Sequence, residues 1–289
     1  MTTRSATHPV LVAWIEATRL VRTQPALLLP LGLAAAAKLL MVIVSLVAPF
    51  TPFSKLLAPV VRYFWGEIYL HYPYHLALAT RWFRKSDLFF PILFEGFLVG
   101  MTAYLCRQVL TNHVPKPRQA FSETFRRYPA TVLIATTSVV VALVSARLLL
   151  IPVQLGLRFV PVVAHSTFGA AFSIAIITLV IAAALEAFFT FSIPACILDN
   201  RSWFRAIGRS VRTAVRSYGR IFLTILAVSL AYLPFIMLRQ GSARLVTSAW
   251  PESILLVYIG RILISWVVGT LLAVWSTIYL LNTADGASR

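Results

Sequence analysis

Long apolar segments without charged side chains constrain this chain more than any other feature. The segments 159–185 and 262–284 contain no Asp, Glu, Lys or Arg. About 20 apolar residues in a helix are enough to cross a hydrocarbon core of roughly 30 Å. Hydrophobic residues make up 59% of the chain and charged residues only 12%, a balance that a soluble core could not accommodate. The sequence therefore predicts an integral membrane protein.

The apolar pattern predicts an all-α polytopic fold, with the residues 1–289 forming a single membrane domain. Basic amphipathic helices are expected at 9–23, 115–127 and 200–219, and each precedes a pair of spans. We therefore expect three helical hairpins, each introduced by a surface helix on the same side. The connection 51–86 is too long for a bare loop and is expected to contain an interfacial helix. The six predicted transmembrane helices cover about 26–50, 87–110, 128–151, 168–193, 221–239 and 255–282.

The charge is strongly positive, with a formal net charge of +17. Lys and Arg are most frequent on the side that holds the N-terminus, 107–127, 195–220 and the C-terminus. The positive-inside rule then predicts both termini in the cytoplasm. Because the basic residues flank apolar spans, anionic lipid headgroups are the expected partners and nucleic acid is not.

The segment 199–220 has the most regular charge pattern. With roughly 100° per helical residue, its arginines fall within an arc of about 100°. This predicts a helix on the membrane surface that binds anionic lipid or an acidic partner, with Asp199 or Asn200 as its N-cap. The arginines are Arg201, Arg205, Arg209, Arg212, Arg216 and Arg220, and the opposite face carries Trp203, Phe204, Ile207, Val211, Val215 and Tyr218.

The same region resembles a bacterial six-span family, the membrane domain found beside some glycerophosphodiester phosphodiesterases and in stand-alone proteins. The resemblance is carried by 192–199, by 203–210 with Ala206 and Ser210 at the family's Ala and Ser positions, and by 218–222. It implies a six-helix all-α fold and a location in a bacterial inner membrane. It implies no activity, because the phosphodiesterase chemistry belongs to a separate soluble domain.

Three ionisable residues are expected inside the spans: Lys38, Glu95 and Glu186. By helical rise, Lys38 lies roughly 18 Å from the cytoplasmic end of its span and Glu95 about 12 Å from the other end of its own. In a core of roughly 30 Å these depths are similar, so we expect the two residues to pair. The pair could be structural, or it could be a substrate or proton site. In the remaining alternative, the two charged groups extend toward the interfaces and do not meet.

For Glu186, the expected partner is Arg205 or Arg209, or else Arg19 or Arg22. Arg147 and Arg261 lie near the outer ends of their spans and are expected to extend their charged groups toward the interface.

Other motifs give weaker indications. His71 and His75 have a spacing that would suit a metal on a helix, but Pro73 and the surrounding aromatic residues favour an interfacial aromatic belt. Gly96 and Gly100 match the GxxxG pattern for close helix packing. There is no nucleophile, Walker or HExxH motif. We therefore expect no enzymatic activity, catalytic residue, cofactor or metal.

These observations favour a non-enzymatic membrane scaffold or accessory subunit, with other membrane protein subunits as candidate partners. The alternative is a transporter or lipid-handling protein that uses Lys38, Glu95 and Glu186. A cavity that reaches these three residues would favour the alternative, and a tightly packed apolar centre would favour the scaffold.

Overall fold

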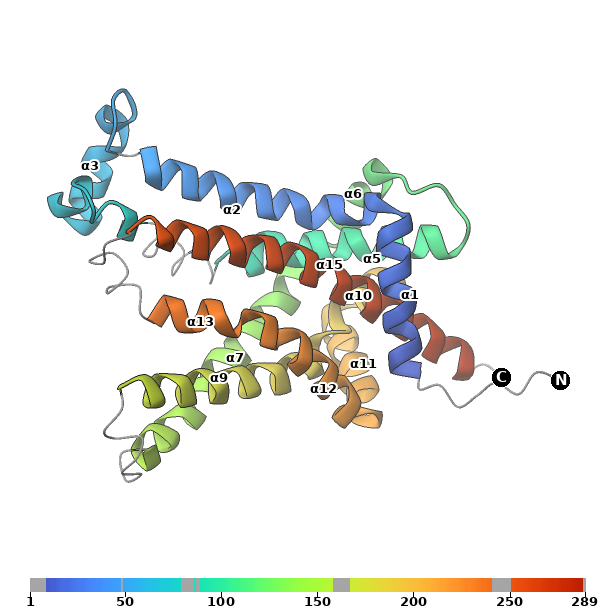
Figure 1. Cartoon of the computed structure of the whole chain (residues 1–289). Helices are drawn as coiled ribbons and strands as arrows, with labels where there is room; N and C mark the ends of the chain where they lie inside the picture. The colour runs from blue at the N-terminus through green and yellow to red at the C-terminus, as the bar shows by residue number, and fades with distance from the viewer. Residues whose placement is uncertain are drawn as a thin grey trace.

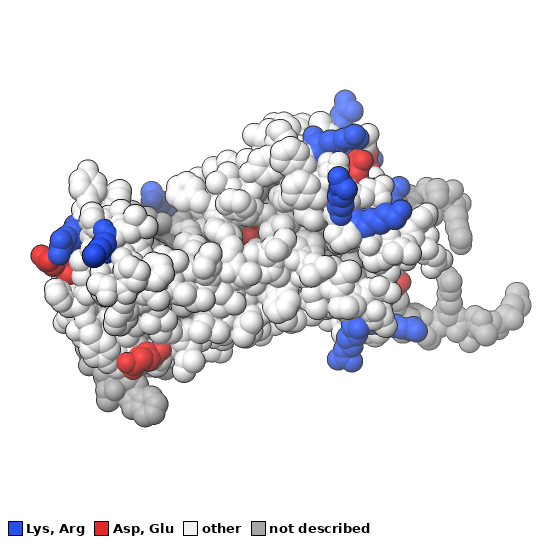
Figure 2. Space-filling view, turned by 90° about the horizontal axis from the view of Figure 1, so that it is seen from above, with Lys and Arg blue, Asp and Glu red and all other residues white. Residues whose placement is uncertain are grey.

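The structure is a computed structural model that describes residues 9–47, 49–78, 86, 89–157, 167–240 and 251–287. Helices are the only regular secondary structure in these ranges. Six helical segments are long and apolar enough to cross a membrane, which confirms the all-α polytopic fold. They are Pro25–Val47, Pro91–Leu110, Tyr128–Leu149, Phe172–Leu198, Tyr218–Leu238 and Ser253–Thr283. Charged side chains gather toward the two ends of the molecule in Figure 2, and a largely uncharged belt separates them.

The described helices follow the predicted order. They are α1 (Pro9–Thr23), α2 (Leu29–Val47), α3 (Phe53–Trp65), α5 (Gly96–Leu110), α6 (Pro117–Phe125), α7 (Tyr128–Leu157), α9 (Thr167–Phe189), α10 (Ser192–Leu198), α11 (Trp203–Arg216), α12 (Tyr218–Ser229), α13 (Leu233–Gln240) and α15 (Ser253–Ala287). Shorter turns join them: the 3₁₀ helices η1 (Pro25–Leu28), η2 (Glu67–Leu70) and η4 (Leu230–Tyr232), and the π-helix η3 (Pro91–Glu95).

The last span, α15, packs at the centre against α1, α2 and α5. Its Trp275 is fully buried and lies edge-on to Trp14 of α1, with the ring centroids 6.0 Å apart. The indole N–H of Trp275 donates to the carbonyl of Val10 at 3.3 Å. These contacts fasten α1 across the bundle, roughly perpendicular to the spans (Figure 1).

The predicted amphipathic segments form α1, α6 and α11, and all three lie at the same end of the bundle as the last turns of α15 (Figure 1). The helix α3 lies at the opposite end and provides the helix expected within 51–86. Its apolar side chains Leu56 and Tyr63 are 75% and 84% exposed, as suits a helix at a lipid interface. The grouping of the spans into three hairpins stays a prediction, and the basic residues Arg81, Arg84 and Lys85 lie outside the described residues.

A turn replaces the helix that could have aligned His71 with His75. The backbone of His71 is extended, and a cis peptide bond joins Tyr72 to Pro73. His75 is buried, with its ring edge-on to Phe50. The helical metal spacing is therefore absent here.

The glycine pair of α5 does face neighbouring helices. A Cβ atom on Gly100 would lie 2.8 Å from Thr124 Cγ2 of α6 and 3.2 Å from Ile197 Cγ1 of α10. A Cβ atom on Gly96 would lie 3.4 Å from Ala135 Cβ of α7. The absence of a side chain at Gly100 therefore allows α6 and α10 to approach α5 closely.

Candidate functional site

A cavity of about 900 Å³ lies among the spans, within the range of known small-molecule sites. The helices α2, α7, α9, α13 and α15 and the π-helix η3 all contribute to its wall. Apolar side chains form most of the lining. The charged and aromatic polar members are Lys38, Glu95, Glu186, Arg261, Tyr232 and Trp266, and the hydroxyl groups come from Ser138, Thr190, Ser229, Ser265 and Ser276.

Lys38 and Glu95 form an ion pair at this cavity, as the depth argument predicted. Lys38 Nζ contacts Glu95 Oε1, and the two side chains are only 12% and 26% exposed. The ammonium group also lies 5.7 Å from the centre of the Phe90 ring. Glu95 ends the π-helix η3, an irregular turn of the kind often found at functional sites. Pairing compensates each charge for the loss of water inside the membrane.

Glu186 on α9 opens onto the same cavity. The prediction that it pairs with Arg205, Arg209, Arg19 or Arg22 is wrong, because Arg209 pairs with Asp199 instead. Across the part of the chain that the structure describes, no basic side chain forms an ion pair with Glu186. This carboxylate therefore faces the cavity without an ionic partner from the described protein.

Tyr232 and Arg261 belong to the site although neither was predicted there. Arg261, which the sequence predicted to extend toward the outer interface, lines the cavity together with Glu186. Tyr232 hydrogen-bonds to Ser265, and its phenol interacts electrostatically with Glu186, Glu95 and Arg261. The cavity thus brings together charges from η3, α9 and α15. By contrast, Arg147 is exposed on α7.

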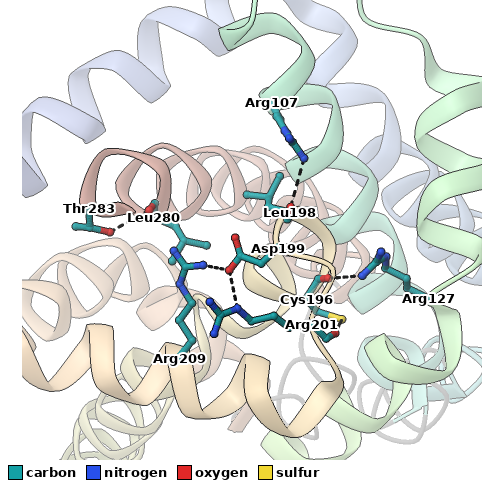
Figure 3. Close-up of polar contacts among 9 residues, drawn as sticks. All are labelled: Arg107, Arg127, Cys196, Leu198, Asp199, Arg201, Arg209, Leu280 and Thr283. Carbon is teal, nitrogen blue, oxygen red and sulfur yellow. Dashed lines mark hydrogen bonds and ion pairs between the residues drawn. The ribbon is translucent and has the colours of Figure 1, made fainter. Parts of the chain in front are cut away.

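A second polar cluster lies at the end of the bundle that holds α11 (Figure 3). Asp199 Oδ2 forms ion pairs with Arg201 Nε, 3.1 Å away, and with Arg209 Nη1. Burial lowers the pKa of the Arg209 guanidinium below its usual range. Asp199 therefore ties α11 to the end of α10 and does not act as the predicted N-cap, which is Ser202.

Two further arginines stabilise the C-terminal end of α10 (Figure 3). Arg107 donates to the carbonyl of Leu198 at 3.3 Å, and Arg127 donates to the carbonyl of Cys196 at 2.9 Å. Both carbonyls belong to the last helical turn, where cations are favoured by the helix dipole. These arginines are thus part of the internal structure.

The continuous six-arginine face is absent. The helix α11 ends at Arg216, and Ser217 has φ −139° and ψ 31°, so Arg220 belongs to α12. Arg201 precedes the helix. Of the arginines on α11, Arg205, Arg212 and Arg216 are exposed, and Arg209 is half-buried.

The buried face of α11 consists of Ala206, Ser210 and Ala214, one turn apart. Ser210 Oγ donates to the carbonyl of Phe188 at 2.5 Å and accepts the backbone N–H of Phe191 at 3.2 Å. Ser210 is therefore small enough for a close helix contact, and its hydroxyl satisfies backbone groups at the end of α9 that lack a partner within the helix.

The exposed apolar residues of α11 complete its amphipathic character. Phe204 and Val215 are 71% and 62% exposed. At about 100° per residue, they lie between the packed face and the arginine face. A helix with one packed face, one exposed apolar face and one arginine face is typical of a helix that lies beside the bundle at a lipid surface.

Comparisons of the chain with protein-family models, curated proteins and solved structures found no match. The resemblance to the six-span membrane domain therefore stays an expectation from the sequence.

Proposed function

We propose that this protein binds an amphipathic small molecule or a lipid in the cavity between its spans, as a transporter or lipid-handling protein would. One observation carries the proposal: Lys38, Glu95 and Glu186 all line a single cavity of about 900 Å³. A structural ion pair alone would need no space beside it. Ionisable groups that line a cavity within membrane spans commonly mark a substrate or ion pathway.

The lining suits an amphipathic ligand. Leu179, Ile262 and Leu272 offer apolar contact, while Tyr232, Ser265 and Ser276 offer hydroxyl groups. Known ligand sites combine a largely apolar wall with a few placed polar groups in this way.

Native mass spectrometry of the gently purified protein tests the proposal. The wild-type protein is expected to carry a bound molecule. Ala182→Phe, one turn from Glu186 on the cavity wall, should reduce its retention. Val180→Phe is the matched control, because Val180 lies on the same helix, is 37% exposed and does not line the cavity. Wild-type protein without a bound molecule, or equal retention in both variants, would contradict the proposal.

A scaffold or accessory subunit is the second candidate. It is supported by the exposed arginines Arg205, Arg212 and Arg216, which could bind anionic lipid or an acidic partner. On this view the end that carries α1, α6 and α11 faces the cytoplasm of a bacterial inner membrane. Replacing the three arginines with Gln should weaken co-purification of anionic lipid or of a stoichiometric partner protein; unchanged co-purification would count against this candidate.

A further inference from the structure

The charged side chains that line the cavity differ in whether they form an ion pair. Lys38 is held by Glu95, while Glu186 has no ionic partner among the described residues. A carboxylate among membrane spans is stable only with a compensating cation or a bound proton. Arg261 lines the same cavity, but none of the ion pairs between described residues includes Glu186. The position beside Glu186 therefore favours a further positive charge.

The surroundings of Glu186 favour an organic cation over a metal ion. No group of three or more His, Cys, Asp and Glu side chains that could hold a metal occurs within the described ranges. Instead, the aromatic residues Phe189, Tyr232 and Trp266 share the cavity with Glu186. Aromatic faces attract ammonium groups, and the attraction strengthens where water is excluded.

The position of one of these aromatic groups is fixed. The indole N–H of Trp266 donates to the carbonyl of Leu28 at 2.9 Å, which joins α15 to the start of the first span. The Trp266 ring is thus held in place without a ligand, and preorganisation of this kind lowers the cost of binding one.

We infer that Glu186 binds the positive group of an amphipathic organic cation, a protonated amine or quaternary ammonium whose apolar part contacts the cavity wall. This inference rests on the proposed function, because it identifies the ligand class of the same cavity.

The test compares two probes of nearly the same size and opposite charge, tetraphenylphosphonium and tetraphenylborate. Their binding to the purified protein is measured by equilibrium dialysis, with protein-free detergent micelles subtracted. Wild-type protein should bind the phosphonium saturably and more tightly than the borate. Glu186→Gln should weaken phosphonium binding more than about tenfold, because the cation loses its desolvated partner. Glu186→Asp should restore part of that binding.

Glu123→Gln is the matched control, since Glu123 lies on α6, does not line the cavity and pairs at the surface with Arg126, three residues along. It should leave binding of both probes unchanged. If Glu186→Gln fails to fold, the preference of the wild-type protein for one probe decides. Equal or tighter binding of the borate to wild-type protein, or unchanged phosphonium binding in a folded Glu186→Gln variant, would overturn the inference.

The two proposals can fail separately. If Ala182→Phe removes a bound molecule but the phosphonium shows no dependence on Glu186, the cavity binds a ligand of another class. If wild-type protein retains no molecule and binds neither probe, both proposals are wrong.

Discussion

Lys38 and Glu95 lie 57 residues apart in the chain, and their side chains form an ion pair among the membrane spans. Neither group could remain charged there at low cost without the other. The pair also forms part of the cavity wall, so it supports both the packing of the first two spans and the polar character of the proposed site.

Removing either charge should destabilise the protein. Lys38→Met or Glu95→Gln leaves the other group without its partner, which costs about 3–5 kcal/mol for a fully buried pair. The double variant Lys38→Glu with Glu95→Lys should recover most of the loss. Thermal unfolding in detergent, followed by size-exclusion chromatography, measures the effect. If the exchange of charges is as damaging as the single changes, the pair has a role beyond mutual compensation.

Asp199→Asn should loosen the junction between α10 and α11. It removes the charge that forms ion pairs with Arg201 and Arg209. Leaving a buried polar partner unsatisfied costs about 1–3 kcal/mol. Glu67→Gln provides the comparison, because its pair with Arg62 is 63% and 57% exposed and should matter by less than about 1 kcal/mol. Equal Tm values for the two variants would show that Asp199 does not stabilise the junction.

Two glycines should respond to alanine in opposite directions. Gly100→Ala places a Cβ atom 2.8 Å from Thr124 Cγ2, and such overpacking costs about 1–3 kcal/mol. Gly208→Ala in α11 meets nothing within 4 Å and should stabilise the helix by up to about 1 kcal/mol. The Tm shifts of the two purified variants check both signs. A neutral Gly100→Ala would mean that α6 can move away from α5.

His75 should make stability fall in mild acid. Burial lowers its pKa below the ordinary 6.5, against the raising effects of a hydrogen bond to the backbone of His71 and of the charge of Glu252. The unfolded chain therefore binds a proton more readily, so stability is complete above the unfolded pKa and decreases as the pH falls toward the folded one. Tm measured from about pH 7.5 to 5 should drop more in wild-type protein than in His75→Gln. Parallel Tm curves would exclude His75 as the cause.

The sequence predicted the spans because their signal is local: long uncharged apolar segments have few alternatives. It also predicted the pair of Lys38 with Glu95, because depth in a membrane is set by helical rise alone. The sequence does not show how each helix is rotated about its axis relative to its neighbours, so it does not show which side chains face each other. The predicted partner of Glu186 was therefore wrong: Arg209 forms an ion pair with Asp199, at the end of α10.

Two further differences have similar causes. The break at Ser217 has no proline to indicate it, so the arginine pattern was extended into α12. The cavity is built from residues of several spans, including Tyr232 and Arg261, and only tertiary packing brings them together. No local pattern could have predicted it.

The most direct test of the account is a cryo-electron microscopy structure of the protein purified with its native lipids. We predict density for a bound molecule in the cavity, within contact distance of Glu186 and beside the pair of Lys38 with Glu95. A closed, tightly packed centre in which Glu186 pairs with a basic side chain of the protein would contradict the account.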